Sequence, residues 1–229
     1  MTDINATVTL PVLDKRVLLL QSRYFADLST EYLERIEELM VEECFERDDM
    51  IFNEGDGNRY LYLVASGAAK IFGTSADGKE QILELSRPGD SFNDVAAFDG
   101  GANPVGAQAL TPLVVYRLSG QVLLDRSCDY GPLAANIVRG LAKRVRELGD
   151  LVADLSFRPV VGRLAKILLE QLPHAGSAKL TQKDMAAMAG TAREVVARAL
   201  KSLEEEGIIR TERQRIVILD RTALEKLTI

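Results

Sequence analysis

The residues that decide the fold run from position 181 to 207 and read TQKDMAAMAGTAREVVARALKSLEEEG. Two short amphipathic segments flank Gly190, which supplies the turn between them. Thr181 opens the first segment with T-x-x-D, which resembles a capping box, and Thr191 opens the second with a complete box, T-x-x-E. Gly207 ends the second segment, as glycine commonly ends helices. Two capped helices joined by a tight turn predict a helix-turn-helix.

The flanking residues extend this motif to a winged domain. Residues 160–172 repeat apolar side chains at helical spacing, and two apolar runs, 208–210 and 215–219, flank a polar turn after the motif. Pro159 lacks an amide donor and restricts the residue before it, so the preceding helix ends there. We therefore expect a winged helix-turn-helix DNA-binding domain over residues 158–229.

The charge of the chain is divided unevenly. The formal net charge is −6, but residues 158–229 hold 13 Lys and Arg against 9 Asp and Glu, whereas the rest holds 15 against 25. A basic C-terminal third on an acidic body indicates a polyanionic partner for that third. Double-stranded DNA is the polyanion that a helix-turn-helix binds.

Residues 131–157, directly before this domain, read as one long dimerisation helix. Apolar residues recur there at alternating intervals of four and three, which is an a/d seam held for three heptads. This regularity favours pairing with a second copy of the chain in a homodimer. The alternative is a long helix packed only on its own domain. The predicted dimer seam consists of Val138, Leu141, Val145, Leu148, Val152 and Leu155.

Between about residues 43 and 125, short strand-like runs alternate with turn residues. Residues 60–64 and 113–118 are typical of such strands, and Asp77-Gly78 is a strong hairpin signal. Many short strands with regular turns predict a sandwich or barrel. The expected fold is therefore α+β, with an N-terminal antiparallel β-barrel or jelly roll over residues 1–130. This domain includes a flanking N-terminal helix, for which Ser29 fits the N-cap.

The second helix of the motif carries the chemistry for reading bases. Its N-terminal residues face base edges in the major groove. Arg193 and Arg198 can each bind guanine O6 and N7 with a guanidinium fork, and Glu194 can accept from cytosine N4. Glu194 also stands in the capping box, so two roles compete for one carboxylate. The alternative is a solvated basic face. Candidate phosphate contacts, which position the protein without reading sequence, are Thr181, Thr191, Lys201, Arg213 and Arg215.

The chain from about residue 24 to 225 resembles the CRP/FNR family of bacterial transcription regulators. Residues 193–198, REVVAR, are similar to the R-E-x-x-x-R recognition helix of the family, including all three base-reading positions. The resemblance implies a cyclic-nucleotide-binding-like barrel, a homodimer on an inverted-repeat DNA site, and RNA polymerase as a further partner. It also implies an effector, between barrel and dimer helix, that reorients the DNA-binding pair. The other carrying segments are the heptad helix, 53–56 (NEGD), 61–67 (LYLVASG) and 88–92 (PGDSF).

The implied effector pocket departs from the cyclic-AMP-binding members. Where those members hold the phosphate with Gly-Glu and Arg-Ser pairs, this chain has Asn93-Asp94 and Pro104-Val105, and Leu148-Gly149 stands where a Thr-Ser pair binds the base. Burying a phosphate without a cation or hydroxyl costs on the order of several kcal/mol. We therefore expect no tight binding of cyclic AMP. The effector is an anion, a small metabolite or none, and Asn93 and Asp94 have loop capping as their alternative role. The implied pocket residues are Gly89, Phe92, Asn93, Asp94, Val105, Arg144 and Leu148.

The residue types argue against several other classes of site. Cys44 and Cys128 cannot alone form a four-thiolate iron–sulfur or zinc site. We expect two buried or inert thiols, with a redox pair as the alternative. The chain has one histidine, His174, which lies in an expected turn. Because bis-histidine haem ligation needs two histidines, one chain cannot supply it. Haem bound by Met, Tyr or a terminal amine remains an alternative.

The sequence also bears on competing functions and location. No catalytic motif appears, so we expect no enzyme. No apolar run of about 18 residues occurs, so we expect no membrane span and a cytoplasmic location. A competing function is a cyclic-nucleotide-type sensor that acts on a protein partner instead of DNA, and the Arg193, Glu194 and Arg198 set argues against it.

Overall fold

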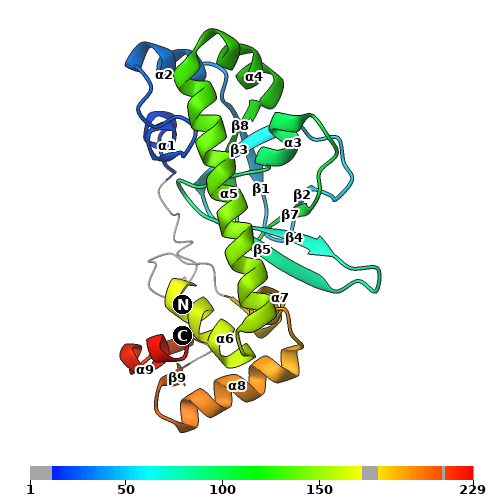
Figure 1. Ribbon diagram of the computed structural model, residues 1–229, viewed down its shortest axis with the longest axis vertical. Helices are drawn as coiled ribbons and strands as arrows, with labels where there is room; N and C mark the ends of the chain where they lie inside the picture. The colour runs from blue at the N-terminus through cyan, green and yellow to red at the C-terminus, as the bar shows by residue number, and fades with distance from the viewer. Residues whose placement is uncertain (1–11, 172–179, 213–214, 229) are drawn as a thin grey trace, which may run out of the picture. The chain divides into compact units, whose positions relative to one another are not determined.

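The computed structural model describes residues 12–171, 180–212 and 215–228 (Figure 1). Their contacts divide the chain into two compact units. The first comprises Met1–Ala69 and Ser86–Gly140, and the second comprises Lys70–Leu85 and Leu141–Ile229. The elements are antiparallel strands, a long helix and a C-terminal winged helix-turn-helix, which confirms the predicted α+β class. The division into residues 1–130, 131–157 and 158–229 stays a prediction.

The first unit is built on a four-stranded antiparallel sheet in the order β1-β8-β3-β6. β3 and β8 share the longest register, from Tyr60 opposite Ser119 to Ser66 opposite Val114. β3 is buried along almost its whole length, which explains its unbroken apolar sequence. A further pair, β2 with β7, is also antiparallel. The bounds are β1 Val41–Phe45, β2 Met50–Phe52, β3 Tyr60–Ser66, β6 Ser91–Phe92, β7 Gly106–Ala109 and β8 Leu113–Ser119.

Four short helices of the first unit begin where the local sequence supplies or permits a cap. Ser29 accepts a hydrogen bond from the amide of Tyr32, which confirms it as the predicted N-cap of α2. Asp14 and Ser119 cap α1 and α4 in the same way. α3 follows Asn93, which adopts a left-handed conformation. The bounds are α1 Lys15–Gln21, α2 Thr30–Glu37, α3 Asp94–Asp99 and α4 Gly120–Asp129.

The long helix α5 extends over Gly131–Phe157, the range that the heptad pattern predicted. One face buries Leu133, Ile137 and Gly140. Gly140 has a close neighbour, because a Cβ built on it would lie 2.3 Å from Cε1 of the buried Tyr24 ring. A side chain at this position would therefore separate α5 from Tyr24.

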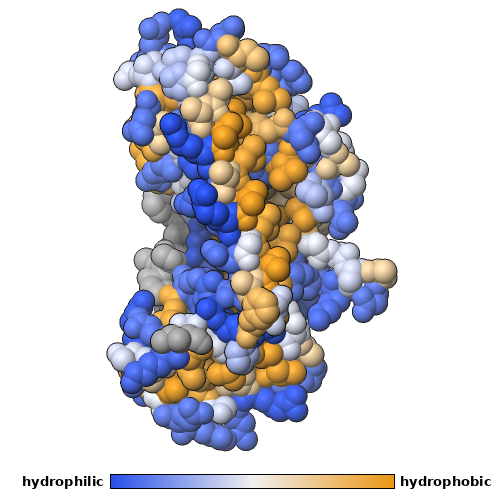
Figure 2. Space-filling view, in the orientation of Figure 1, coloured by the Kyte–Doolittle hydropathy of each residue, from blue (hydrophilic) through white to orange (hydrophobic). Residues whose placement is uncertain are grey.

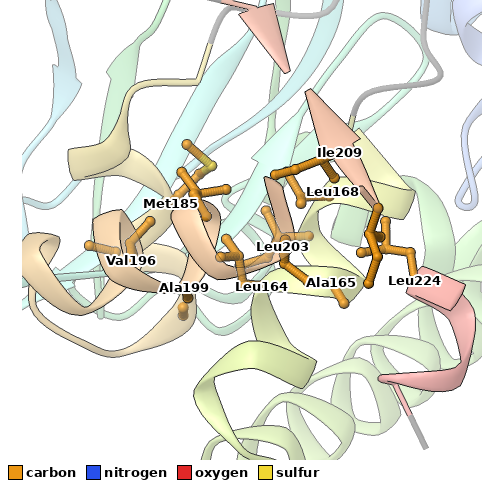
Figure 3. Packing of buried hydrophobic residues seen from close by; sticks show 14 residues of the cluster. Leu164, Ala165, Leu168, Met185, Val196, Ala199, Leu203, Ile209 and Leu224 are labelled. Carbon is orange, nitrogen blue, oxygen red and sulfur yellow. The ribbon is translucent and has the colours of Figure 1, made fainter. Parts of the chain in front are cut away.

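The second unit contains the hairpin β4–β5 and the winged helix-turn-helix. Buried side chains from α6 to α9 and from β9 converge on one apolar core, in which Leu164, Met185, Val196, Leu203 and Leu224 meet (Figure 3). The wing strands β9 and β10 pair antiparallel, as predicted. The bounds are β4 Ala69–Thr74, β5 Glu80–Ser86, α6 Val160–Gln171, α7 Gln182–Ala189, α8 Arg193–Glu205, β9 Ile209–Glu212, β10 Arg215–Ile218 and α9 Arg221–Lys226.

The predicted cap of α7 is confirmed and that of α8 is wrong. Thr181 and Asp184 form a reciprocal capping box. By contrast, α8 has Ala192 as its N-cap and no side-chain cap bond. The Thr191 amide instead donates to the Ala186 carbonyl oxygen over 3.0 Å, after Gly190 has turned left-handed. This bond ends α7 in the manner of a Schellman motif, so Thr191 belongs to the turn.

Two glycines of α5 provide a matched stability test. We expect Gly140→Ala to lower the free energy of unfolding by about 1–3 kcal/mol, because the added methyl would overlap the Tyr24 ring. A Cβ added to Gly149 would have no neighbouring atom within 4 Å. Gly149→Ala should therefore raise the free energy of unfolding by up to about 1 kcal/mol through helix propensity. Urea unfolding followed by the far-ultraviolet circular dichroism of the helices measures both. Equal effects of the two substitutions would contradict the packing of Tyr24 against α5.

Candidate nucleic-acid interface and effector pocket

The second helix of the motif, α8, has one buried apolar face and one exposed charged face. Val196, Ala199, Leu200 and Leu203 are buried in the core of the winged domain. Because these residues recur at helical spacing, they turn the remaining face of α8 outward. The predicted base readers, Arg193, Glu194 and Arg198, are all exposed.

None of the three predicted readers forms an ion pair or a side-chain hydrogen bond with another described residue. Other charged side chains of the same helix are paired, since Lys201 lies 3.6 Å from Glu205 and Glu204 accepts from the Thr211 amide. The guanidinium groups of Arg193 and Arg198 therefore keep their full donor sets for a partner.

Glu194 is not held by a cap, contrary to the expected competition between its two roles. Because α8 begins at Arg193, Glu194 stands in the first helical turn, and its carboxylate has no backbone partner among the described residues. A negative charge there is stabilised by the helix dipole. The carboxylate therefore stays available to accept a hydrogen bond from a base.

The residues predicted to contact phosphate differ in whether their polar groups already have partners within the chain. The Thr181 hydroxyl is used in its own cap, where it donates to Asp184 Oδ2 over 2.7 Å. Thr191 is half-buried in the turn, and its amide is used to end α7. Lys201 is exposed and forms a surface ion pair with Glu205. Arg213 lies outside the described residues, as does the side chain of Arg215.

Two residues of the predicted effector pocket have structural roles. Gly89 has a φ of +96°, and a Cβ there would lie 2.7 Å from Gln21 Oε1. Phe92 is buried and stacks on Tyr62 with 5.0 Å between ring centroids. Burial raises the pKa of the Tyr62 hydroxyl, and the hydroxyl oxygen accepts from Asn58 Nδ2 over 2.8 Å.

Asn93 belongs to a cluster of three asparagines that join two loops. Its Nδ2 donates to the carbonyl oxygens of Asn58, at 3.1 Å, and Tyr60, at 2.9 Å. Its Oδ1 accepts from Asn103 Nδ2 over 2.5 Å. Asn103 is buried, and its Oδ1 accepts a hydrogen bond from the backbone N–H of Asn58 over 3.0 Å. The polar atoms of Asn93 are therefore satisfied within the chain.

Asp94 is buried and accepts a 2.6 Å hydrogen bond from the Tyr24 hydroxyl. Its other carboxylate oxygen accepts from the Val95 amide over 3.1 Å, inside the first turn of α3. These bonds support the interpretation of Asn93 and Asp94 as loop and helix-end residues. Sequence reasoning missed Asn58, Asn103 and Tyr24, because single polar residues far apart in the chain carry no spacing signal.

The remaining residues of the predicted pocket, Arg144, Val105 and Leu148, differ in burial and in ion pairing. Arg144 forms ion pairs with Glu84 and, at 3.8 Å, with Glu147. Val105 is half-buried and Leu148 is exposed. The guanidinium of Arg144 is thus already neutralised by carboxylates of the same unit.

Cys44 and Cys128 are both exposed, so the expected burial of the thiols is wrong, whereas their inertness stays a prediction. His174 lies outside the described residues. Within the described ranges, no three His, Cys, Asp or Glu side chains are grouped as a metal-ligand set. None of the described helices combines the length and hydropathy that a membrane span requires.

Two family models match separate parts of the chain. Residues 42–126 match the model of a cyclic nucleotide-binding domain. Residues 162–227 match that of a Crp-like helix-turn-helix domain. The second match contains the whole of α8 with its exposed arginines.

The chain is similar to several bacterial regulators and their structures. It is 31% identical over 191 residues to the CRP-like cAMP-activated global transcriptional regulator of Mycobacterium tuberculosis, covering 80% of this chain and 85% of that protein. It is 34% identical over 209 residues to the cyclic AMP receptor protein of Thermus thermophilus, covering 88% and 91%. The structure of FixK2 from Bradyrhizobium japonicum is 25% identical with a TM-score of 0.74, covering 83% and 98%. On the extent of these similarities and the winged helix-turn-helix that they share, this chain belongs to the CRP/FNR family of transcription regulators.

Proposed function

We propose that this chain is a sequence-specific transcription regulator that binds double-stranded DNA as a homodimer on an inverted-repeat site. The observation that carries the proposal is the outward face of α8, where Arg193, Glu194 and Arg198 are exposed and unpaired among the described residues. Arginine forks and a carboxylate match the major-groove edges of guanine and cytosine.

The seam of α5 supports the homodimer. Val138, Val145 and Val152 have 67%, 68% and 62% of their surface exposed, and Leu148 has 37%. Figure 2 shows hydrophobic residues following the line of α5 across the face of the molecule. Contact between such an apolar stripe and water is unfavourable, so burial of the stripe against another apolar surface would stabilise the protein.

The residue types of the seam favour a parallel pair of helices. With Val138 as position a, every a position from 138 to 152 is valine and every d position from 141 to 155 is leucine. β-Branched residues at a with leucine at d favour two parallel strands. Two protomers related by a twofold axis present two recognition helices, which suits an inverted repeat.

The effector of the barrel stays unassigned, and we propose that it is not cyclic AMP. Some relatives carry that ligand in their names. In this chain Pro104 and Val105 offer the phosphate no side-chain donor, and Asn93 and Asp94 are bonded to neighbours in the chain. The proposal also extends to a cytoplasmic location and RNA polymerase as partner, supported by the regulator relatives. A sensor that acts on a protein partner is the competing function, and it predicts no preference among DNA duplexes.

Replacement of Arg198 should separate base reading from phosphate contact. In fluorescence anisotropy with the duplex that the chain selects from random sequences, Arg198→Ala should cost about 1–3 kcal/mol and relax the preference at one base position. Lys201→Ala is the matched variant, and it should weaken binding evenly across sequences and reduce the salt slope by about 1. An equal loss on all sequences for Arg198→Ala would assign that side chain to phosphate.

A charge on the seam should dissociate the dimer. Val145→Glu would bury a carboxylate against its symmetry mate, so analytical ultracentrifugation at micromolar concentration should show monomer. Lys143→Glu is the matched control, because Lys143 is exposed and occupies heptad position f, which points away from the seam. This control introduces the same carboxylate two residues away and should stay dimeric. A Val145→Glu protein that stays dimeric would refute the proposal that α5 forms the dimer interface.

Titration calorimetry tests the exclusion of cyclic AMP. We expect no heat of binding at micromolar concentrations of the nucleotide, because a phosphate left without a compensating donor weakens binding by on the order of several kcal/mol. The Thermus thermophilus relative, named a cyclic AMP receptor protein, is the positive control. A dissociation constant in the micromolar range for this chain would refute the expectation.

A further inference from the structure

The β4–β5 hairpin contacts the helix-turn-helix, although it lies within the residues that match the nucleotide-binding model. Gln81 Nε2 on β5 donates to the carbonyl oxygen of Met188 on α7 over 3.3 Å. Gln81 Oε1 lies 3.0 Å from the point that a Cβ on Gly190 would occupy. One side chain of the hairpin thus reaches both α7 and the turn before α8.

Apolar and charged contacts surround this hydrogen bond. Phe72 and Ile82 of the hairpin form a buried cluster with Ala187 of α7. Glu80 accepts a 2.5 Å bond from the buried Lys70 and lies 3.6 Å from Lys183 of α7. Burial raises the pKa of Glu80, but the hydrogen bond and charge of Lys70 outweigh it and the pKa lies below its ordinary value. The carboxylate is therefore charged where it meets Lys183.

The same hairpin also contacts the dimer helix. Glu84 of β5 pairs with Arg144 of α5, and both side chains are largely buried. At the turn, Leu155 Cδ2 of α5 lies 2.7 Å from the point of a Cβ on Gly190. The hairpin, α5 and the helix-turn-helix therefore meet in one set of contacts inside the second unit.

We infer that the β4–β5 hairpin is a latch that fixes the helix-turn-helix to the dimer helix in an orientation able to bind DNA. This inference rests on the proposed function, since a fixed orientation matters only for a dimer that spans two half-sites. The latch acts on α7 and the turn, and none of its contacts involves Arg193, Glu194 or Arg198. It positions the recognition helix and leaves its reading face open.

Gln81→Glu tests the latch, because it replaces the amide donor by a carboxylate facing the Met188 carbonyl oxygen. The probes are the palindrome that the wild-type chain selects, the same palindrome with one base pair added between its half-sites, and a single half-site. Gln81→Glu also removes the hydrogen bond that Nε2 donates to the Ile82 carbonyl oxygen over 3.1 Å within β5. We expect about a tenfold loss of affinity for the selected palindrome, as the loss of the hydrogen bond that joins β5 to α7 would give. The preference for the native spacing should shrink, and half-site affinity should not change.

Two controls make the outcome decisive. Lys79→Ala alters an exposed residue near the hairpin tip whose side chain forms no hydrogen bond or ion pair among the described residues, and it should behave like wild type. Hydrogen exchange of residues 182–190 should rise in Gln81→Glu only. Unchanged spacing preference, or tighter binding, in a folded Gln81→Glu protein would overturn the latch. A wild-type chain without any preferred duplex would instead refute the proposed function.

Discussion

The proposed assembly of this protein depends on one helix, α5, which has two apolar faces. α5 buries Leu133 and Ile137 on one side and exposes Val138, Val145 and Val152 on the other. Only a second apolar surface can remove the exposed side from water, and the regular a/d spacing favours the proposed pairing with another copy of the same helix. The proposed paired recognition helices, the proposed inverted-repeat site and the inferred role of the latch all depend on that association.

Local signals in the sequence predicted the elements well where a residue has one dominant role. The C-terminal end of α5 and the Thr181 cap are confirmed because a proline and a reciprocal side-chain pair each act within a few residues. The cap of α8 was wrong because Thr191 has two possible roles. Its pattern fits a box, but its amide is needed to close the turn after Gly190, and that bond excludes it from α8.

The candidate site was predictable only in part, for a related reason. Arg193, Glu194 and Arg198 are close together in the chain, so helical spacing alone puts them on one surface. The asparagine cluster joins positions 58, 93 and 103, and the latch joins Gln81 to Met188, so only the folded chain brings their partners together. Isolated polar residues give no periodic signal, and their roles depend on contacts that cross many intervening residues.

The flanks of the seam have a consequence for how ionic strength acts on this protein. All e positions beside the seam, Ala135, Ala142, Gly149 and Ser156, are small and uncharged, and the one charged g residue, Arg144, is neutralised by Glu84. In the proposed homodimer, association along α5 thus lacks the ion pairs that salt screens, whereas the proposed contact with a phosphate backbone would be weakened by salt. If the proposed homodimer forms, rising salt should therefore release it from DNA as an intact dimer and should not dissociate it into monomers.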